Sequence, residues 1–158
     1  MKQLRKEFFN RDTLVVAKEL VGKILQVDDI KVRILETEAY KQDKASHAYK
    51  KTPRSSIMFE TYGYVYVYLI YGMYYCLNFT TDSSPGAVLI RGVEGANGPG
   101  KLCKMLSITK KDNGLEVGGR IKIFDDNYKP IIKRSERIGI KQDTHLKWRF
   151  FDSNFMQQ

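Results

Sequence analysis

Two glutamates at the end of an apolar strand pattern are the first residues that could do chemistry. In "IKVRILETEAY" the side chains that alternate onto one strand face are Ile30, Val32, Ile34, Glu36, Glu38 and Tyr40. A buried glutamate is costly unless it has a partner or a task. At the border of a pocket, desolvation would raise its pKa from about 4.3 and make it a stronger base. The alternative is a β-bulge that turns both carboxylates to solvent.

The segment "YGYVYVYLIYGMYYCLN" (62–78) holds seven of the ten tyrosines of the chain. On a strand, its aliphatic side chains take one face and four tyrosines take the other: Tyr62, Tyr64, Tyr66 and Tyr68. Such a face could stack on nucleobases, at about 1–3 kcal/mol per base. The alternative is ordinary strand packing, because tyrosine is common in strands.

The same segment predicts a hairpin with an aromatic tip. Gly72 lies near the predicted tip, with Tyr71 and Met73 beside it. Proteins that enter the DNA minor groove insert such side chains between base steps, so this tip could replace an extracted base. The alternative is a tip that packs against the rest of the protein. Arg91, the first charge after the apolar run "AVLI", is either a strand-end charge or a cation directed into a pocket.

Capping residues, turns and periodicity indicate the elements that position these residues. A helix is predicted over 11–22, since Asp12 or Thr13 can cap it and Gly22 can end it. A second helix is predicted within 95–108, where Pro99 suits the first turn. Strands are predicted around a turn at 28–29, around the hairpin tip, and over 87–93 and 120–124, with a polar loop over 41–56. The pattern favours the α+β class, with a largely antiparallel sheet in a single domain over 1–158.

Composition narrows the classes of partner. With 27 Lys and Arg against 18 Asp and Glu, the formal charge is +9, which makes nucleic acid the first partner to consider, against a merely basic soluble protein. Cys76 and Cys103 are too few for a disulfide framework. No CxxC pair is present and His47 and His145 are far apart, so no zinc site is expected. Neither a signal peptide nor an apolar run of about 20 residues is visible, so no membrane partner is expected.

Several motifs in a fixed order together resemble the alkyladenine (3-methyladenine) DNA glycosylase family. They are "ETEAY", His47, "TPR", "YVYLIYGMYYCLN", the spacing from Asn78 to Arg91, "GPGKLC" and "RIGI", which span about Glu7 to Phe151. The resemblance implies a curved antiparallel sheet like that of the C-terminal domain of methionyl-tRNA formyltransferase, with flanking helices and a protruding hairpin. It also implies base excision repair: a damaged purine is flipped from double-stranded DNA and its N-glycosidic bond is hydrolysed, leaving an abasic site.

The resemblance further implies no metal or organic cofactor, no lyase step and a monomer, located in the cytoplasm if bacterial or the nucleus if eukaryotic. It assigns roles residue by residue. Glu38 would be the general base that activates water, Arg91 and the backbone of Ile138 would hold that water, and Glu36 is the structural runner-up. The remaining assignments are pocket walls at Tyr40, His47 and Tyr68, a guanine-excluding residue at Asn78, a wedge at Tyr71 and Met73, and DNA-backbone contacts at Arg54 and Lys101.

The loops after Tyr40 and Arg91 and the tail after "WRFF" are short beside some relatives, which affects the expected substrate range and DNA footprint. Two other functions remain open. One is a non-catalytic nucleic-acid-binding module that uses the same basic, aromatic face. The other is a tRNA-contacting accessory domain, in which the acid of "ETEAY" has no obvious purpose.

Overall fold

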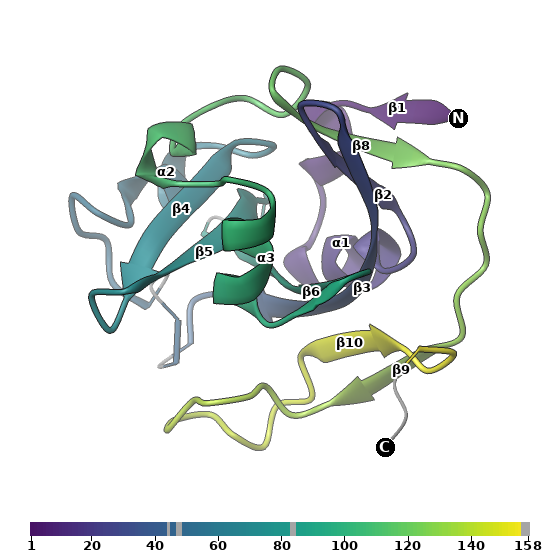
Figure 1. Ribbon diagram of the computed structural model, residues 1–158. Coiled ribbons are helices and arrows are strands. Elements are labelled where there is room, and N and C mark those ends of the chain that lie inside the picture. Colours follow the sequence, from purple (N-terminus) through teal and green to yellow (C-terminus); the bar gives the residue numbers. More distant parts are fainter. Residues whose placement is uncertain (44, 47–48, 83–84, 156–158) are drawn as a thin grey trace.

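The computed structural model describes residues 1–43, 45–46, 49–82 and 85–155. One ten-stranded sheet organises the chain (Figure 1). Its neighbouring strands are, in order, β1 (Lys2–Leu4), β8 (Ile121–Asp125), β2 (Ile24–Val27), β3 (Ile30–Tyr40), β6 (Ala87–Val93), β5 (Tyr74–Thr80) and β4 (Val65–Ile70). Off this path, β7 (Ala96–Asn97) pairs with β6, and β10 (Arg149–Asp152) pairs with β3 and β9 (Ile132–Ser135). All these pairings are antiparallel, so the predicted α+β class with a largely antiparallel sheet is confirmed.

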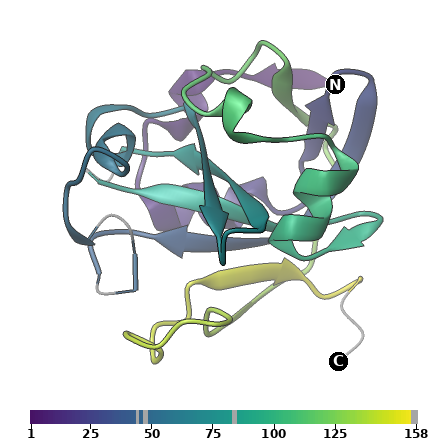
Figure 2. The ribbon, with the colours of Figure 1, turned by 60° about the vertical axis from the view of Figure 1, so that its left-hand side comes forward.

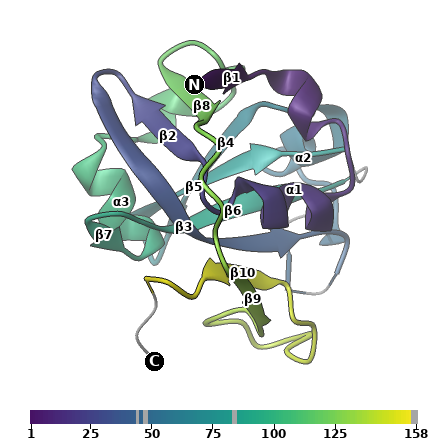
Figure 3. The ribbon, with the colours of Figure 1, turned by 90° about the vertical axis from the view of Figure 1, so that its right-hand side faces the viewer.

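The first predicted helix is confirmed as α1 (Thr13–Leu20). It begins at its predicted cap, because the Asp12 carboxylate accepts a hydrogen bond from the Leu14 N–H at 3.0 Å. Its side chains Val16, Ala17 and Leu20 are fully buried, and Figure 3 shows the helix lying against β3 and β6. The helix therefore covers the sheet at the point where the two acids of β3 are found.

The second predicted helix is α3 (Pro99–Met105), which has Pro99 in its first turn and packs on β5 and β6. A short helix, α2 (Ser56–Glu60), follows the predicted polar loop. Two 3₁₀ helices, η1 (Lys6–Phe9) and η3 (Lys110–Asp112), complete the helical segments that carry labels here. Nowhere in the described part of the chain is a helix long and apolar enough to cross a membrane.

The alternation predicted for the tyrosine strand holds in β4. Val65 and Val67 belong to the main apolar core, which also contains side chains of α1 and α3. Tyr66 and Tyr68 lie on the other face, where they pack with Met58 of α2 in a second cluster. The strand thus separates an aliphatic core from an aromatic wall.

That wall has two tyrosines rather than the four predicted. Tyr62 packs against the main core, and the Tyr64 hydroxyl donates to the Glu116 carboxylate at 3.3 Å. Both precede β4, so the alternation of a regular strand does not extend to them.

The pairing of β3 with β6 is irregular beside the two acids. Its register shifts twice, skipping Leu35 on β3 and then Arg91 on β6. Beyond the shifts, Thr37 faces α1, since its hydroxyl donates to a carbonyl of that helix at 2.8 Å, and Glu36 and Glu38 lie on the opposite face. The unbroken alternation predicted along this strand is therefore wrong, but the bulge does not expose the acids, because only 2% of Glu36 and 0% of Glu38 is accessible.

The basic tail, which the sequence pattern left unplaced, forms β9 and β10. Because β10 pairs with β3, it brings the segment between β9 and β10 close to the end of β3. Figure 2 shows the C-terminal pair below the β4–β5 hairpin, and residues 138–140, between β9 and β10, line the same cavity as the hairpin tip. The candidate site lies where these three parts of the chain meet.

Candidate active site

Three groups converge on the carboxylate of the buried Glu38. The Tyr40 hydroxyl donates to Oε1 at 2.7 Å, and the backbone N–H of Ile138 donates to Oε2 at 2.8 Å. Arg91 Nε lies 3.5 Å from Oε2. Burial is the largest influence on the pKa of Glu38 and raises it, whereas these three groups lower it by less. The raised pKa makes this carboxylate a stronger base than an exposed glutamate.

Arg91 reaches the acids because it occupies the irregular position of β6. A residue skipped by the ladder is free of the regular alternation, so its side chain can be redirected. Its Nε lies within ion-pair distance of both Glu38 and Glu36, at 3.5 and 3.7 Å. Arg91 also lines the neighbouring cavity, which fits a cation directed into a pocket rather than a charge that merely ends a strand.

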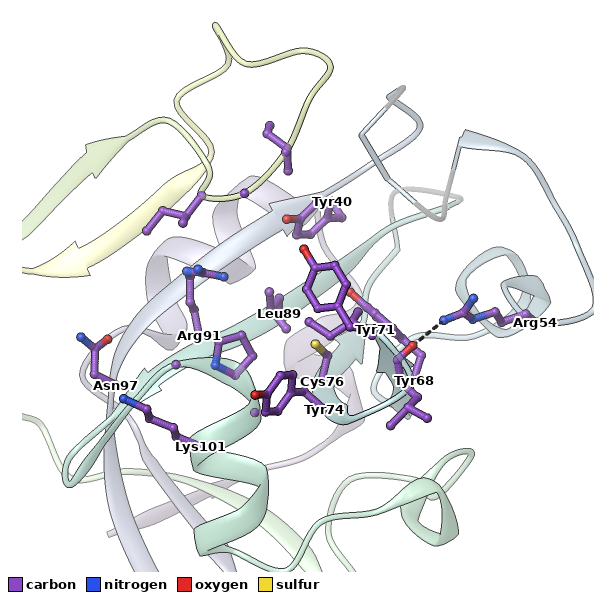
Figure 4. A pocket seen from close by; sticks show the side chains of 18 residues that line it. Tyr40, Arg54, Tyr68, Tyr71, Tyr74, Cys76, Leu89, Arg91, Asn97 and Lys101 are labelled. Carbon is purple, nitrogen blue, oxygen red and sulfur yellow. Dashed lines mark hydrogen bonds between the residues drawn. The ribbon is translucent and has the colours of Figure 1, made fainter.

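A cavity of about 640 Å³ opens beside this cluster (Figure 4). Its lining comes from β3, the β4–β5 hairpin, β6, the start of α3 and the segment before β10. Seven of the residues assigned from the sequence line it: Tyr40, Arg54, Tyr68, Tyr71, Arg91, Lys101 and Ile138. Glu38 is not exposed in the cavity and lies directly behind Tyr40, Arg91 and Ile138.

Two tyrosine rings form the aromatic walls of the cavity. The hydroxyl of Tyr40 is held by Glu38, while the Tyr68 ring packs on the Tyr66 ring with centroids 5.2 Å apart. Burial raises the pKa of Tyr68, and burial followed by the charge of Glu38 raises that of Tyr40, so both phenols are neutral at ordinary pH. Neutral rings with fixed orientations are suited to stacking on a planar ligand.

Arg54 lines the cavity but is engaged with the protein. Its guanidinium lies 5.4 Å from the centroid of the Tyr68 ring and donates to the Leu69 carbonyl at 3.1 Å. The contact supports the aromatic wall and the base of the hairpin. The predicted DNA-backbone role of Arg54 is untested, and the contacts in this structure are internal ones.

Asn78 and Met73 lie outside the large cavity. The buried Asn78 amide donates to the Tyr66 carbonyl at 3.2 Å and borders a hollow of about 70 Å³, shared with Tyr40 and Tyr68. Met73 lines a second cavity of about 650 Å³ between the hairpin and α3. Asn78 thus lies behind the tyrosine walls, and Met73 is separated from the site by Tyr74, which borders both large cavities. His47 lies outside the described residues.

The hairpin tip projects its side chains instead of packing them. Tyr71 is 82% exposed and Met73 is 66% exposed. Tyr71 and Gly72 both have left-handed backbone angles, with φ of 53° and 65°, and the Met73 N–H bonds to the Ile70 carbonyl, as in a type I′ turn. A bulky residue is rare at such an angle. The fold therefore holds an exposed ring at a strained position beside the cavity.

Arg137 is the main structural contributor that the sequence reasoning missed. Its guanidinium is buried between the Tyr40 and Trp148 rings, 4.8 and 5.0 Å from their centroids. It also bonds to both carboxylate oxygens of Asp43 and to the Ala39 carbonyl. It therefore ties the Ile138 segment to β3. Arg137 belongs to the motif "RIGI", which pointed to this segment, but nothing in the sequence distinguishes Arg137 from the exposed charges of the same tail.

Metal-ligating side chains do not gather in groups of three or more within the described ranges. Cys76 and Cys103 are both buried free thiols. Cys76 lines the cavity, and burial raises its pKa to about 11. The charged groups of the site are thus carboxylates, guanidinium groups and the Lys101 ammonium group.

A buried carboxylate with a raised pKa lies next to an aromatic cavity on a strongly basic chain, an arrangement that fits an enzyme acting on nucleic acid. The sequence model of the Methylpurine-DNA glycosylase (MPG) family matches residues 7–96 and 94–155. The chain is 45% identical to a Sodalis glossinidius protein over an alignment of 161 positions, which covers 93% of this chain and 95% of that protein. It is 41% identical to a Clostridium novyi protein over an alignment of 200 positions, gaps included, which covers both chains completely. Both relatives carry the name "Putative 3-methyladenine DNA glycosylase".

The chain belongs to the methylpurine-DNA glycosylase family. It is therefore a DNA glycosylase, and its substrate is DNA. This confirms the family resemblance inferred from the motifs.

Proposed function

We propose that the chain is a monofunctional glycosylase that removes alkylated or deaminated purines, 3-methyladenine among them, from double-stranded DNA. The purine is flipped into the cavity between Tyr40 and Tyr68. The names of the family and of the relatives support alkylated purines as the lesion class, and deaminated purines extend the proposal. Extrusion costs a few kcal/mol and is easiest for damaged or mispaired bases, and stacking on the two rings offsets part of that cost. The geometry of Glu38 carries the proposal.

Glu38 acts as the general base. A water held by Arg91 at the Glu38 Oε2 attacks C1′ of the sugar, and its proton passes to Glu38. The C1′–N bond breaks and its electron pair leaves with the base, so an alkylated cationic purine departs neutral, whereas a neutral purine such as hypoxanthine takes up a proton from solvent as it leaves. An abasic site remains. The sugar develops oxocarbenium character as the bond breaks, which a nearby carboxylate stabilises.

Tyr71 occupies the space that the flipped nucleotide leaves in the stack. Its exposure and its place at the hairpin tip support this role, because a wedge must reach beyond the protein surface. We also propose that one copy of the chain suffices, since every group named above comes from a single chain.

Glu38→Gln tests the assignment. Its amide keeps nearly the same shape but cannot accept a proton, so we expect lesion DNA to be bound while base release falls by a factor of about 10² or more. The assay is single-turnover release from a duplex with one hypoxanthine or 3-methyladenine, read as strand cleavage by alkali. Glu19→Gln, at an exposed ion pair with Arg11, is the matched control and should behave as the unchanged protein.

Two results would count against the proposal. Normal turnover by Glu38→Gln would remove Glu38 from the chemistry. Binding of lesion duplex without any excision by the unchanged protein would favour the non-catalytic binding module instead.

A further inference from the structure

The second acid of β3, Glu36, has no part in the mechanism above, yet it is 98% inaccessible and its Oε2 is paired with two arginines. Arg149 Nε bonds to its Oε2, and Arg149 also donates to the Ser135 hydroxyl at 2.8 Å. On its other side, Arg91 Nε lies 3.7 Å from the same oxygen. Glu36 therefore holds one arginine that belongs to the C-terminal strands and one that belongs to the site.

Arg91 is shared between the two acids, at 3.5 Å from Glu38 and 3.7 Å from Glu36. Two buried carboxylates and two guanidinium groups thus form one cluster. In such a cluster each charge depends on all the others, because low local dielectric strengthens every interaction. Removing Glu36 would free Arg91 to move and would leave Arg149 without its acid.

The chain makes room for Glu36. A Cβ at Gly92 would lie 3.0 Å from the Glu36 Oε1, so this position on β6 has no space for a larger residue. A separate cavity of about 340 Å³ also borders Glu36, and Asn97 lines both this cavity and the large one. The acid therefore borders a hollow of its own rather than lying deep in the apolar core.

We propose that Glu36 is a positioning residue for hydrolysis, which holds the Arg91 guanidinium at Glu38 and places a second negative charge beside that base. The inference rests on the proposed function of Glu38. Glu36 itself need not touch the DNA or the water. A purely structural role would instead be to fasten β10 to β3 through Arg149.

The groups that face Glu38 determine which substitutions can change its pKa. They are Glu36 and Tyr40 from β3, Tyr68 from β4, Cys76 from β5 and Arg91 from β6, together with the Ile138 N–H. The phenols and the thiol are neutral at ordinary pH, because their pKa values are raised. Among the residues that the structure describes, Arg91 and Glu36 are the charged groups that act on Glu38 directly, whereas Arg149 acts through Glu36 and Arg137 through Tyr40.

The test is the rate of single-turnover excision as a function of pH for three variants. In Glu36→Gln the lost negative charge favours ionised Glu38, so the acid limb of the pH–rate profile, where the rate falls as Glu38 is protonated, should move to lower pH. The plateau rate should fall about ten-fold, because the base is weaker and Arg91 is displaced. Glu36→Asp retains the charge, so its acid limb should stay in place with a smaller loss of rate. Arg149→Gln removes a positive charge from the same strand contact, so its acid limb should move to higher pH.

Thermal melting and lesion-duplex binding establish that each variant is folded. If Glu36 only fastened β10, both Glu36→Gln and Arg149→Gln would melt earlier with the acid limb unchanged, and the inference would be wrong. If Glu36→Gln does not fold, Arg149→Gln alone decides. An acid limb that stays in place or moves to lower pH in that variant overturns the positioning role of Glu36. Glu38→Gln separates the two proposals: its normal turnover ends the proposed function, whereas its inactivity beside an unmoved limb in Glu36→Gln ends only the role of Glu36.

Discussion

The hydrogen bond from the Tyr40 hydroxyl to Glu38 can be removed while the wall of the cavity is kept. Tyr40→Phe retains the ring, its stacking on Arg137 and its place in the cavity lining, but loses the donor at 2.7 Å from Oε1. That donor stabilises the ionised carboxylate and so lowers the pKa of Glu38. Without it, protonated Glu38 is favoured and the base is switched off at a higher pH.

The magnitude follows from the strength of the bond. A hydrogen bond to a charged group contributes about 1.5–3 kcal/mol, which corresponds to about one to two pH units. We therefore expect the acid limb of the excision rate to move upward by about that amount, with a roughly ten-fold or greater loss below the limb and near-normal activity at the alkaline plateau.

Single-turnover excision of hypoxanthine between pH 5 and pH 9.5 measures the shift, and binding of the lesion duplex checks that the pocket is intact. Binding should be nearly unchanged, since the ring remains. An acid limb that stays in place or moves downward would refute the reasoning. A uniform loss at every pH would show that the hydroxyl acts by some other route than the titration of Glu38.

Two further substitutions probe the pocket and the hairpin. Asn78→Ser should release detectable guanine from undamaged DNA, because the amide is placed behind the tyrosine walls, and it should cost about 1–3 kcal/mol of stability by removing the hydrogen bond from that amide to the Tyr66 carbonyl. Guanine release no greater than that of the unchanged protein excludes a gate role. Tyr71→Gly should leave the melting temperature within a few degrees, since the ring is exposed and glycine suits its φ of 53°, yet lower duplex excision about ten-fold. Full duplex activity would exclude a wedge.

Local features determined several elements from the sequence alone. The Asp12 cap predicted the start of α1, and the Tyr71–Gly72 pair predicted the hairpin turn. The alternation along β4 separated Val65 and Val67 from Tyr66 and Tyr68. These predictions succeeded because capping, turn geometry and strand periodicity depend on residues within a few positions of one another.

The site itself was decided by pairings between distant segments. The double register shift between β3 and β6 set the orientation of Glu38 and Arg91, and no single-strand pattern contains such a shift. The Ile138 N–H reaches Glu38, a hundred positions away, because β10 pairs with β3 and Arg137 is buried under Tyr40. The sequence alone identified the two glutamates of "ETEAY" as the candidate catalytic carboxylates. Which acid is desolvated, and which cation it meets, depended on long-range contacts, because burial and charge are properties of the assembled fold.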